Sequence, residues 1–508
     1  MKKQLPARPT LEQLKKQAKD LHKLHASGDA EAIQRARESH PQFVDEPDEA
    51  IRDAEFPLSD AQLVIAREYG FESWPKLKAH VQSVALETDD PAELFKEAVT
   101  MDNTAHARRI LERHPELKDR INEPLLGFDA PAIVQARSRE MIDVLLAAGA
   151  DINAKSRWWA GGFGLLHGVN PELAAYAVER GAIVDIHAAA RMGLLDRLRA
   201  LVSADPALVH ARGGDGQTPL HFASTAAIAE YLLDHGADIE ARDVDHESTP
   251  AQYMVKDRQD VARCLIRHGC KTDILMAAAL GDADLVSKHL DNNPDCIRLR
   301  VSDEFFPMVG GKTGGTIYQW TLGWYVSAHQ VARQFGHEDV LSLLMERSPV
   351  DVKLLAACWL GDESTVKSLL AMQPNIAASL LDADRRHLAH AARNDNLTAV
   401  RLMLTAGLPL DGRSQEGGTP LHWAAFYGDR AMVMVLLQHN PPLEITDTVH
   451  NGTPLDWAIY GSQHSGFRQV GNYPVVVEML IKAGAKFESP DGTEEVKEVM
   501  RRYGDPNR

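Results

Sequence analysis

The stretch GGTPLHWAAFYGD at residues 417–429 decides the fold, because its pattern recurs along the chain at a regular spacing. Thr419 is placed to cap a helix, and Pro420 follows at the first helical position, where a missing N–H costs nothing. Gly428 is expected to end that helix. Residues 432–437 then carry apolar side chains at the spacing of a second helix. Neither short helix can bury its apolar side alone, so the sequence predicts a stack of helix pairs.

The same signature returns as Thr218-Pro219-Leu220-His221 and Thr453-Pro454-Leu455-Asp456. A second mark, Gly-Ala-Asp followed by an apolar residue, appears as Gly149-Ala150-Asp151-Ile152 and Gly236-Ala237-Asp238-Ile239. Together these two marks resemble the ankyrin repeat family. The resemblance implies an all-α, ankyrin-repeat solenoid of roughly a dozen stacked helix pairs, which usually works as a binding surface and seldom as a catalyst.

Composition restricts the partners. Across 508 residues, 72 Asp and Glu outnumber 55 Lys and Arg, giving a net charge of −17 that repels nucleic acids and anionic membranes. The start of the chain, residues 1–6, is basic but is not followed by the apolar core of a signal peptide. We therefore expect a cytoplasmic monomer with no membrane span. The cysteines lack metal-site spacing, so we expect no disulfide and no metal; they are Cys264, Cys270, Cys296 and Cys358.

The array divides into five segments. Residues 1–86 are predicted to be an N-terminal helical cap with worn, ankyrin-like units, since terminal units meet water on one face. Residues 87–299 form the first half of the repeats and residues 327–490 the second half. Between them lies an aromatic and Gly-rich insertion at 300–326, and residues 491–508 are expected to form a polar closing helix.

Two insertions interrupt the repeats. The first, 300–326, combines glycines with many aromatic residues, whereas a mobile linker would be polar and poor in aromatic residues. We expect it to fold back on the array as an ordered finger. Its Gly311-Lys312-Thr313 is no phosphate-binding loop, because Phe306 stands where that loop needs glycine. The second insertion, 462–473, interrupts the last full unit.

The histidines of the repeat signature are interpreted as structural. In ankyrin proteins this imidazole typically bonds backbone groups between neighbouring units, and the resemblance implies the same role here. Carboxylates and cations elsewhere have no spacing that specifies a reaction, so we assign no enzymatic activity, no catalytic residue and no cofactor. The signature histidines are His167, His187, His221, His329 and His422.

Candidate binding residues come from indexing side chains within the repeat, because the family's variable positions generally face a concave groove. Four consecutive units place aromatic, imidazole and guanidinium groups there, which are typical anchors of binding sites. Equally, these rings could pack on the two insertions as internal core. The candidates are Trp359, His390, Arg393, Trp423, Phe426, Tyr427, Trp457 and Tyr460, with Trp320 and Trp324 from the finger.

The leading prediction is a scaffold that recognises a protein or peptide through the aromatic groove of its C-terminal half. The alternative is a small-molecule-binding protein or atypical enzyme, with a pocket between the concave face and the 300–326 and 462–473 insertions. In that pocket we expect Asp456 close to Arg393, where it would be paired or would have a raised pKa. Further polar groups of this expected pocket are His390, His464 and Arg468.

Overall fold

A computed structural model describes residues 11–44, 46–54, 56–78, 81, 90–311, 313–414, 416–468 and 470–504. Within it the chain forms two compact units, Met1–Ala188 and Ala189–Arg508. Lys312 and the basic start at residues 1–6 lie outside the described residues.

The first unit contains two helical groups. In the first group, residues between Leu14 and Val81 form a hydrophobic cluster of their own. In the second group, α7 packs on α9 and α9 packs on α10. The helices are α1 (Leu11–Ala26), α2 (Ala30–Ser39), α3 (Asp48–Asp53), α4 (Leu58–Glu68), α6 (Pro91–Thr100), α7 (Thr104–Arg113), α8 (Glu116–Asp119), α9 (Arg139–Ala147), α10 (Pro171–Glu179) and α11 (Ile186–Arg191), which runs into the second unit.

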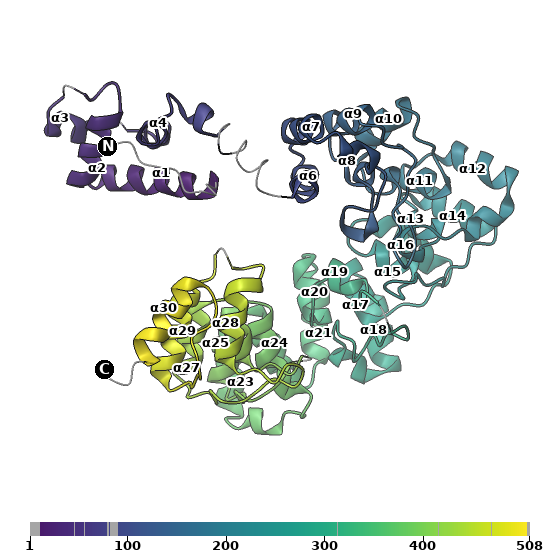
Figure 1. Cartoon of the computed structure of the whole chain (residues 1–508). Coiled ribbons are helices and arrows are strands. Elements are labelled where there is room, and N and C mark those ends of the chain that lie inside the picture. The colour runs from purple at the N-terminus through teal and green to yellow at the C-terminus, as the bar shows by residue number, and fades with distance from the viewer. Residues whose placement is uncertain are drawn as a thin grey trace. The chain divides into compact units, whose positions relative to one another are not determined.

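The second unit is a row of antiparallel helix pairs (Figure 1). First helices contact first helices and second helices contact second helices, as in α24, α26 and α28 on one side and α25, α27 and α29 on the other. The helices are α12 (Leu195–Ala204), α13 (Pro219–Phe222), α14 (Ala226–Asp234), α15 (Pro250–Met254), α16 (Gln259–Arg267), α17 (Ile274–Leu280), α18 (Ala283–Asn292), α19 (Tyr318–Thr321), α20 (Ala328–Gln334), α21 (Glu338–Arg347), α22 (Val350–Leu360), α23 (Glu363–Met372), α24 (His387–Arg393), α25 (Leu397–Thr405), α26 (Pro420–Phe426), α27 (Arg430–Leu437), α28 (Pro454–His464), α29 (Tyr473–Ala483) and α30 (Glu494–Gly504).

The pair α26 and α27 follows the local rules that its sequence predicts. Thr419 is the N-cap of α26 and Pro420 its first residue. Gly428 has a φ of 65°, a left-handed conformation that suits glycine and turns the chain into α27. Asp429 then caps α27 by accepting hydrogen bonds from the backbone N–H groups of Ala431 and Met432. The predicted all-α solenoid of helix pairs is therefore confirmed for this unit.

Helix α30 covers the end of this row by packing on α29. Its Val496, Val499 and Met500 are buried in the same hydrophobic cluster that runs through the C-terminal repeats. A closing helix was expected here, but it is amphipathic, because one side of it must bury the last repeat.

The 300–326 insertion is an ordered finger, as predicted. Its two ends meet in an antiparallel bridge between Arg300 and Ser327. Between them Tyr318, on the short helix α19, is fully buried, and its hydroxyl donates to Asp273 Oδ2 at 2.9 Å. Phe306 packs against the Tyr318 ring with 5.4 Å between centroids. Aromatic burial therefore gives this Gly-rich segment its fixed path.

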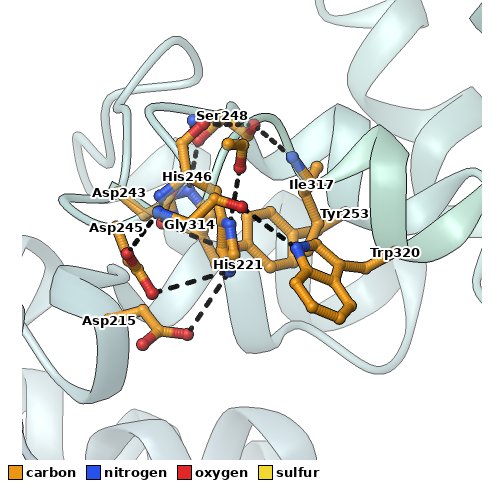
Figure 2. A network of polar contacts seen from close by, with 11 residues as sticks. Asp215, His221, Asp243, Asp245, His246, Ser248, Tyr253, Gly314, Ile317 and Trp320 are labelled. Atoms are coloured by element: carbon orange, nitrogen blue, oxygen red, sulfur yellow. Dashed lines mark hydrogen bonds and ion pairs between the residues drawn. The ribbon is translucent and has the colours of Figure 1, made fainter. Parts of the chain in front are cut away.

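The tip of the finger binds the turn that precedes α15 (Figure 2). Gly314 N–H donates to Asp245 Oδ1 at 2.8 Å, and Ile317 N–H donates to Ser248 Oγ at 3.1 Å. The Gly315 carbonyl lies 2.7 Å from His246 Nδ1. These bonds join segments that are 69 residues apart. The finger is thus fastened to the turns of the preceding repeats by polar contacts.

Two negative findings apply to the described part of the chain. It contains isolated β-bridges but no strand. No helix in it combines the length and the apolar character needed to cross a bilayer.

Candidate functional site

Aromatic side chains line the first helices of successive C-terminal repeats. At the centre, Trp423 of α26 and Trp457 of α28 meet edge to face, with centroids 5.0 Å apart. Trp423 Nε1–H donates to Ser414 Oγ and Trp457 Nε1–H donates to Asp447 Oδ2, both at 2.8 Å. Each indole is therefore held by ring packing and by the hydrogen bond that it donates to a neighbouring turn, so the pair is preorganised.

Further rings extend this pair. Phe426 lies with its centroid 5.9 Å from that of Trp457, and Tyr427 lies 5.6 Å from Phe426. The Tyr427 hydroxyl donates to the Arg393 carbonyl at 2.8 Å. Burial raises the pKa of Tyr427 to about 12, so its hydroxyl stays protonated and remains a donor at neutral pH. The rings thus form one connected surface across α24, α26 and α28.

Arg393 links this surface to the finger. Its guanidinium lies 4.4 Å from the Trp324 ring centroid and 5.1 Å from that of Trp423, so it contacts an indole of each. Its Nη2 forms an ion pair with Glu416 at 2.8 Å. Burial lowers the pKa of Arg393, but Glu416 acts in the opposite direction and favours the charged form. Asn394 adds a bond from its Nδ2 to the Trp324 carbonyl at 2.7 Å.

A cleft of about 500 Å³ adjoins the Arg393–Glu416 pair. Within the described residues, Trp324 Nε1, Arg393 Nη1 and Glu416 Oε2 are buried and have no hydrogen-bond partner. Buried polar atoms without partners are rare and point to a missing ligand or water. The cleft is lined by Asp303, Pro307, Met308, Thr313, Gly314, Gly315, Gln319, Trp324, Arg393 and Glu416.

Two of the predicted candidates lie in the interior. Trp359 is 5% exposed and donates its indole N–H to His387 Nδ1 at 2.8 Å. His390 is 3% exposed and stacks on Tyr325 with centroids 3.5 Å apart. Burial lowers the pKa of His390 to about 2, so its imidazole is neutral at neutral pH. Both rings therefore pack beside Tyr325 in the interior.

Other candidates are accessible. Tyr460 is 58% exposed and packs loosely on His464, with 4.4 Å between centroids. Trp320 is 67% exposed, and its indole donates to the carbonyl of Gly314 on the finger itself at 3.2 Å. Phe426 and Trp457 are half-buried. A partner could therefore reach Tyr460, Phe426 and Trp457 without any rearrangement of the fold.

The expected Asp456–Arg393 pair is wrong. Asp456 is exposed, and its Oδ2 accepts hydrogen bonds from both the N–H and the hydroxyl of Thr453 at 2.8 Å. It therefore caps α28, while Arg393 takes Glu416 as its carboxylate. His464 and Arg468 are exposed as well, so they do not line an enclosed pocket.

A second cleft, of about 620 Å³, lies beside the 462–473 insertion. Tyr427 and Phe467 form its aromatic wall, with centroids 4.8 Å apart. Asp395 and Asp429 lie at its edge, and the pKa of Asp395 is raised by burial and by the nearby Asp429. This cleft shares no lining residue with the cleft beside Arg393, so the expected single pocket under both insertions is instead two separate clefts.

Two of the repeat histidines, His422 and His221, make the backbone bonds between units that the resemblance implies. His422 accepts from the Thr419 N–H at Nδ1, and its Nε2 donates to the Gly452 carbonyl at 3.0 Å. His221 repeats this arrangement with the Ser248 carbonyl at 3.2 Å. His329 Nε2 contacts the Ser348 hydroxyl at 2.8 Å. His167 differs because its Nε2 faces Asp185 at 3.2 Å.

Several residues of this surface were not predicted from the sequence. Ser414, Glu416 and Asp447 lie in turns between repeats and fix the rings and Arg393 from outside the helices. A usable signal was present, since Asp447 precedes Thr453 by six residues, the same interval that separates Asp243 from Thr249. Phe467 was inside a named insertion but was not singled out.

The geometry above defines a repeat protein with an aromatic surface on its C-terminal repeats, and comparison with known families agrees that it is a repeat protein. Residues 186–275, 354–451 and 388–491 match the family described as "Ankyrin repeats (3 copies)". These stretches of the chain are ankyrin repeats, and ankyrin repeats generally mediate protein–protein interaction.

Individual relatives are similar over short stretches. The chain is 34% identical over 98 residues to an E3 ubiquitin-protein ligase XB3 of Oryza sativa subsp. japonica, covering 19% of this chain and 22% of the relative. It is 32% identical over 104 residues to a palmitoyltransferase AKR1 of Lachancea kluyveri, covering 20% of this chain and 14% of the relative. The match therefore spans less than a quarter of either relative.

A solved structure also matches. The ankyrin repeat domain of Bcl-3 is 19% identical, and the match covers 58% of this chain and 97% of that domain with a TM-score of 0.22. A TM-score this low carries no argument about arrangement or function.

Proposed function

We propose that the protein is a recognition scaffold that binds a protein or peptide through the aromatic surface of its C-terminal repeats. The observation that carries the proposal is the fixed Trp423–Trp457 pair, with centroids 5.0 Å apart and both indole N–H groups hydrogen-bonded. Binding surfaces that are rigid before binding lose little conformational entropy on association. The accessible Tyr460 and the half-buried Phe426 and Trp457 are the proposed contacts.

The candidate residues divide into two roles under this proposal. Tyr460 and Trp457 touch the partner, because aromatic side chains bury a large area at low entropic cost. Trp359, His390 and Trp423 hold the surface, since they are 5%, 3% and 7% exposed. Replacing Trp423 with alanine therefore tests the stability of the repeats, whereas replacing Tyr460 tests recognition.

The experiment uses a phage-displayed random peptide library selected on the full chain. Affinities of the selected peptides are then measured for the wild type and for Tyr460→Ala, with Tyr503→Ala on α30 as the matched exposed-tyrosine control. We expect Tyr460→Ala to weaken binding about tenfold or more, as for an energetic anchor, with an unchanged unfolding midpoint. Equal affinity for Tyr460→Ala and the control would show that the peptides bind elsewhere.

A second candidate function is the capture of a small polar ligand in the cleft beside Arg393. It is favoured by Trp324 Nε1, Arg393 Nη1 and Glu416 Oε2, two donors and one acceptor that have no hydrogen-bond partner and belong to residues lining this cleft. Such convergent polar groups in a concave site are typical of small-molecule binding. A ligand that carries both a carboxylate and an ammonium group would satisfy all three atoms.

This candidate is tested by thermal-shift screening of the full chain against zwitterionic amino acids. We expect a dose-dependent rise of the midpoint with the wild type and none with Glu416→Gln, which removes the charge but keeps the shape. A ligand that stabilises both proteins equally would place its binding outside this cleft.

A further inference from the structure

A second, independent site lies where the finger meets the turns of two repeats (Figure 2). Asp215 comes from the turn before α13, and Asp245 and His246 come from the turn before α15. The carboxylate oxygens of Asp215 and Asp245 each lie 3.9 Å from His246 Nε2. All three residues are buried, with exposures of 8%, 5% and 9%. Two buried carboxylates thus face one imidazole nitrogen.

The hydrogen bond of His246 Nδ1 determines which ring nitrogen carries the proton in the neutral imidazole. Nδ1 lies 2.7 Å from the carbonyl oxygen of Gly315, and a carbonyl can only accept, so Nδ1 carries the proton. In the neutral imidazole Nε2 then carries a lone pair, and this lone pair faces the two carboxylates. At 3.9 Å neither carboxylate is within hydrogen-bond distance of Nε2. Two buried carboxylates and a neutral imidazole that face one another are stabilised by a positive charge among them, which either the protonated imidazole or a bound cation supplies.

The second contact of His246 is the kind that metal-ligating histidines make. Such a histidine usually donates its other ring N–H to a carbonyl or carboxylate, which fixes the tautomer and the ring orientation. Here the Gly315 carbonyl accepts the hydrogen bond of His246 Nδ1. The Gly314 N–H likewise orients Asp245, because it donates to Asp245 Oδ1 at 2.8 Å. The finger therefore orients two of the three ligand-type groups.

The close approach of the finger depends on glycine. A Cβ on Gly314 would lie 2.8 Å from His246 Cε1, closer than real Cβ atoms come, and 3.2 Å from Asp245 Oδ1, which is tight. Gly315 has a φ of 70°, which permits its carbonyl to turn toward His246. The Gly-rich sequence that resembles a phosphate loop is thus explained by closure over this cluster.

A similar cluster in the first unit shows what a satisfied arrangement looks like. His167 Nε2 lies 3.2 Å from Asp185 Oδ2, which also accepts from Lys155 Nζ at 3.0 Å. Asp185 Oδ1 accepts from the Ala188 N–H at 2.9 Å. Burial alone would raise the pKa of Asp185, but these bonds outweigh it and lower the pKa. That carboxylate is held by hydrogen-bond donors and an ion pair, so it serves as the comparison for the cluster under the finger.

We propose that Asp215, Asp245 and His246 bind a divalent transition-metal ion of the zinc type, with the finger closing over it. One imidazole nitrogen and two carboxylate oxygens suit such an ion better than magnesium or calcium, which prefer oxygen ligands alone. Ligand bonds of about 2.0–2.2 Å require the three groups to approach one another by a few tenths of an ångström. Side-chain rotation supplies this, because none of the three ligating atoms is in van der Waals contact with another.

The experiment is calorimetric titration of zinc chloride into the chelator-treated full chain, beside the variants Asp245→Asn and His246→Gln. Asp185→Asn is the matched control, because it alters the other His–Asp cluster. We expect one equivalent to bind the wild type and the control alike. Both variants should lose about tenfold or more in affinity, and magnesium chloride should not compete.

A second measurement separates metal binding from misfolding. The near-isosteric Asp245→Asn keeps the oxygen that accepts from Gly314, so its metal-free unfolding midpoint should match that of the wild type. Zinc should raise the midpoint of the wild type and leave that of the variant unchanged, since only the native wild type binds it. Saturable zinc binding that Asp185→Asn removes, or that Asp245→Asn retains, would overturn the assignment. Failure of this site would leave the proposed peptide surface untouched, because the two share no residue.

Discussion

The turns at 243–253 and 447–457 occupy the same place in two repeats and differ in what covers them. In each, an aspartate accepts from backbone N–H groups and from the aromatic residue ten positions on: Tyr253 for Asp243 at 3.0 Å and Trp457 for Asp447 at 2.8 Å. His246 in the first turn is buried under the finger, whereas His450 at the same place in the second turn is exposed.

The pKa shifts of the two aspartates have opposite directions although their hydrogen bonds are alike. Burial raises the pKa of Asp243 despite its hydrogen bonds. At Asp447 burial also acts to raise the pKa, but bonds from His450, Trp457 and Gly452 outweigh it, and the pKa is lowered. One turn is thus specialised as part of a closed polar cluster, and the other supports an open aromatic surface.

The largest expected effect on stability comes from loosening the finger that covers the first turn. Tyr318→Ala deletes a fully buried ring and leaves Asp273 without its hydroxyl partner, so we expect a loss of about 3–5 kcal/mol in the free energy of unfolding. Tyr318→Phe, the control, keeps the ring and should lose about 1–3 kcal/mol. Chemical denaturation measures both, and an unchanged midpoint for Tyr318→Ala would show that the finger is not packed as described.

The two aspartates should respond to acid in opposite directions. Asp447→Asn removes an acceptor from Gly452 and Trp457 and should cost about 1–3 kcal/mol at neutral pH. Because the folded pKa of Asp447 is lowered, its contribution is complete above about pH 4 and is lost as the pH falls below that value, so this cost should shrink in acid.

For Asp243→Asn the cost of the substitution depends on pH in the opposite direction. The folded pKa of Asp243 is raised, so the wild type gains stability as the pH falls from neutral toward about 4, and the cost of the substitution should grow. Denaturation midpoints at several pH values test both variants. Parallel pH profiles for the two would contradict the difference in cover.

The two histidines give a smaller contrast. His246→Ala leaves the Gly315 carbonyl without its donor and should cost about 1 kcal/mol in metal-free buffer. His450→Ala changes an exposed side chain and should stay within about 0.5 kcal/mol. Thermal unfolding of the pair compares them directly, and equal losses would mean that the finger does not shield His246.

The smallest effect is expected from copying one ligand into the open turn. Val449 stands where the covered turn has Asp245 and is 60% exposed, so Val449→Asp should change stability by less than about 0.5 kcal/mol. It should add no zinc equivalent, since no finger covers that turn. An added equivalent would show that cover is unnecessary for binding.

The sequence predicted what depends on local rules. Thr419, Pro420 and Gly428 mark the ends of α26 by capping and backbone preferences, and the aromatic content of 300–326 indicated an ordered finger. Repeat register placed Trp423 and Trp457 at equivalent positions of consecutive units, and in the structure their rings are in contact. These features need only residues close in sequence or one repeat apart.

The rest depends on pairings that no local rule fixes. Arg393 forms its ion pair with Glu416, because Asp456 already caps its own helix, α28. The cluster of Asp245 and His246 is completed by Gly315, 69 residues from His246, and the path of the finger decides that distance in space. Cysteine spacing was the signal used to look for metal sites, and it carries no information about a cluster of aspartate and histidine.

The bridge between Arg300 and Ser327 has one more consequence. Because the inserted segment leaves and re-enters the array at neighbouring points, its length can change without shifting the register of the repeats on either side. The entropic cost of a longer loop rises only logarithmically with its length. Evolution or engineering can therefore change the length of this segment while the helical framework stays the same.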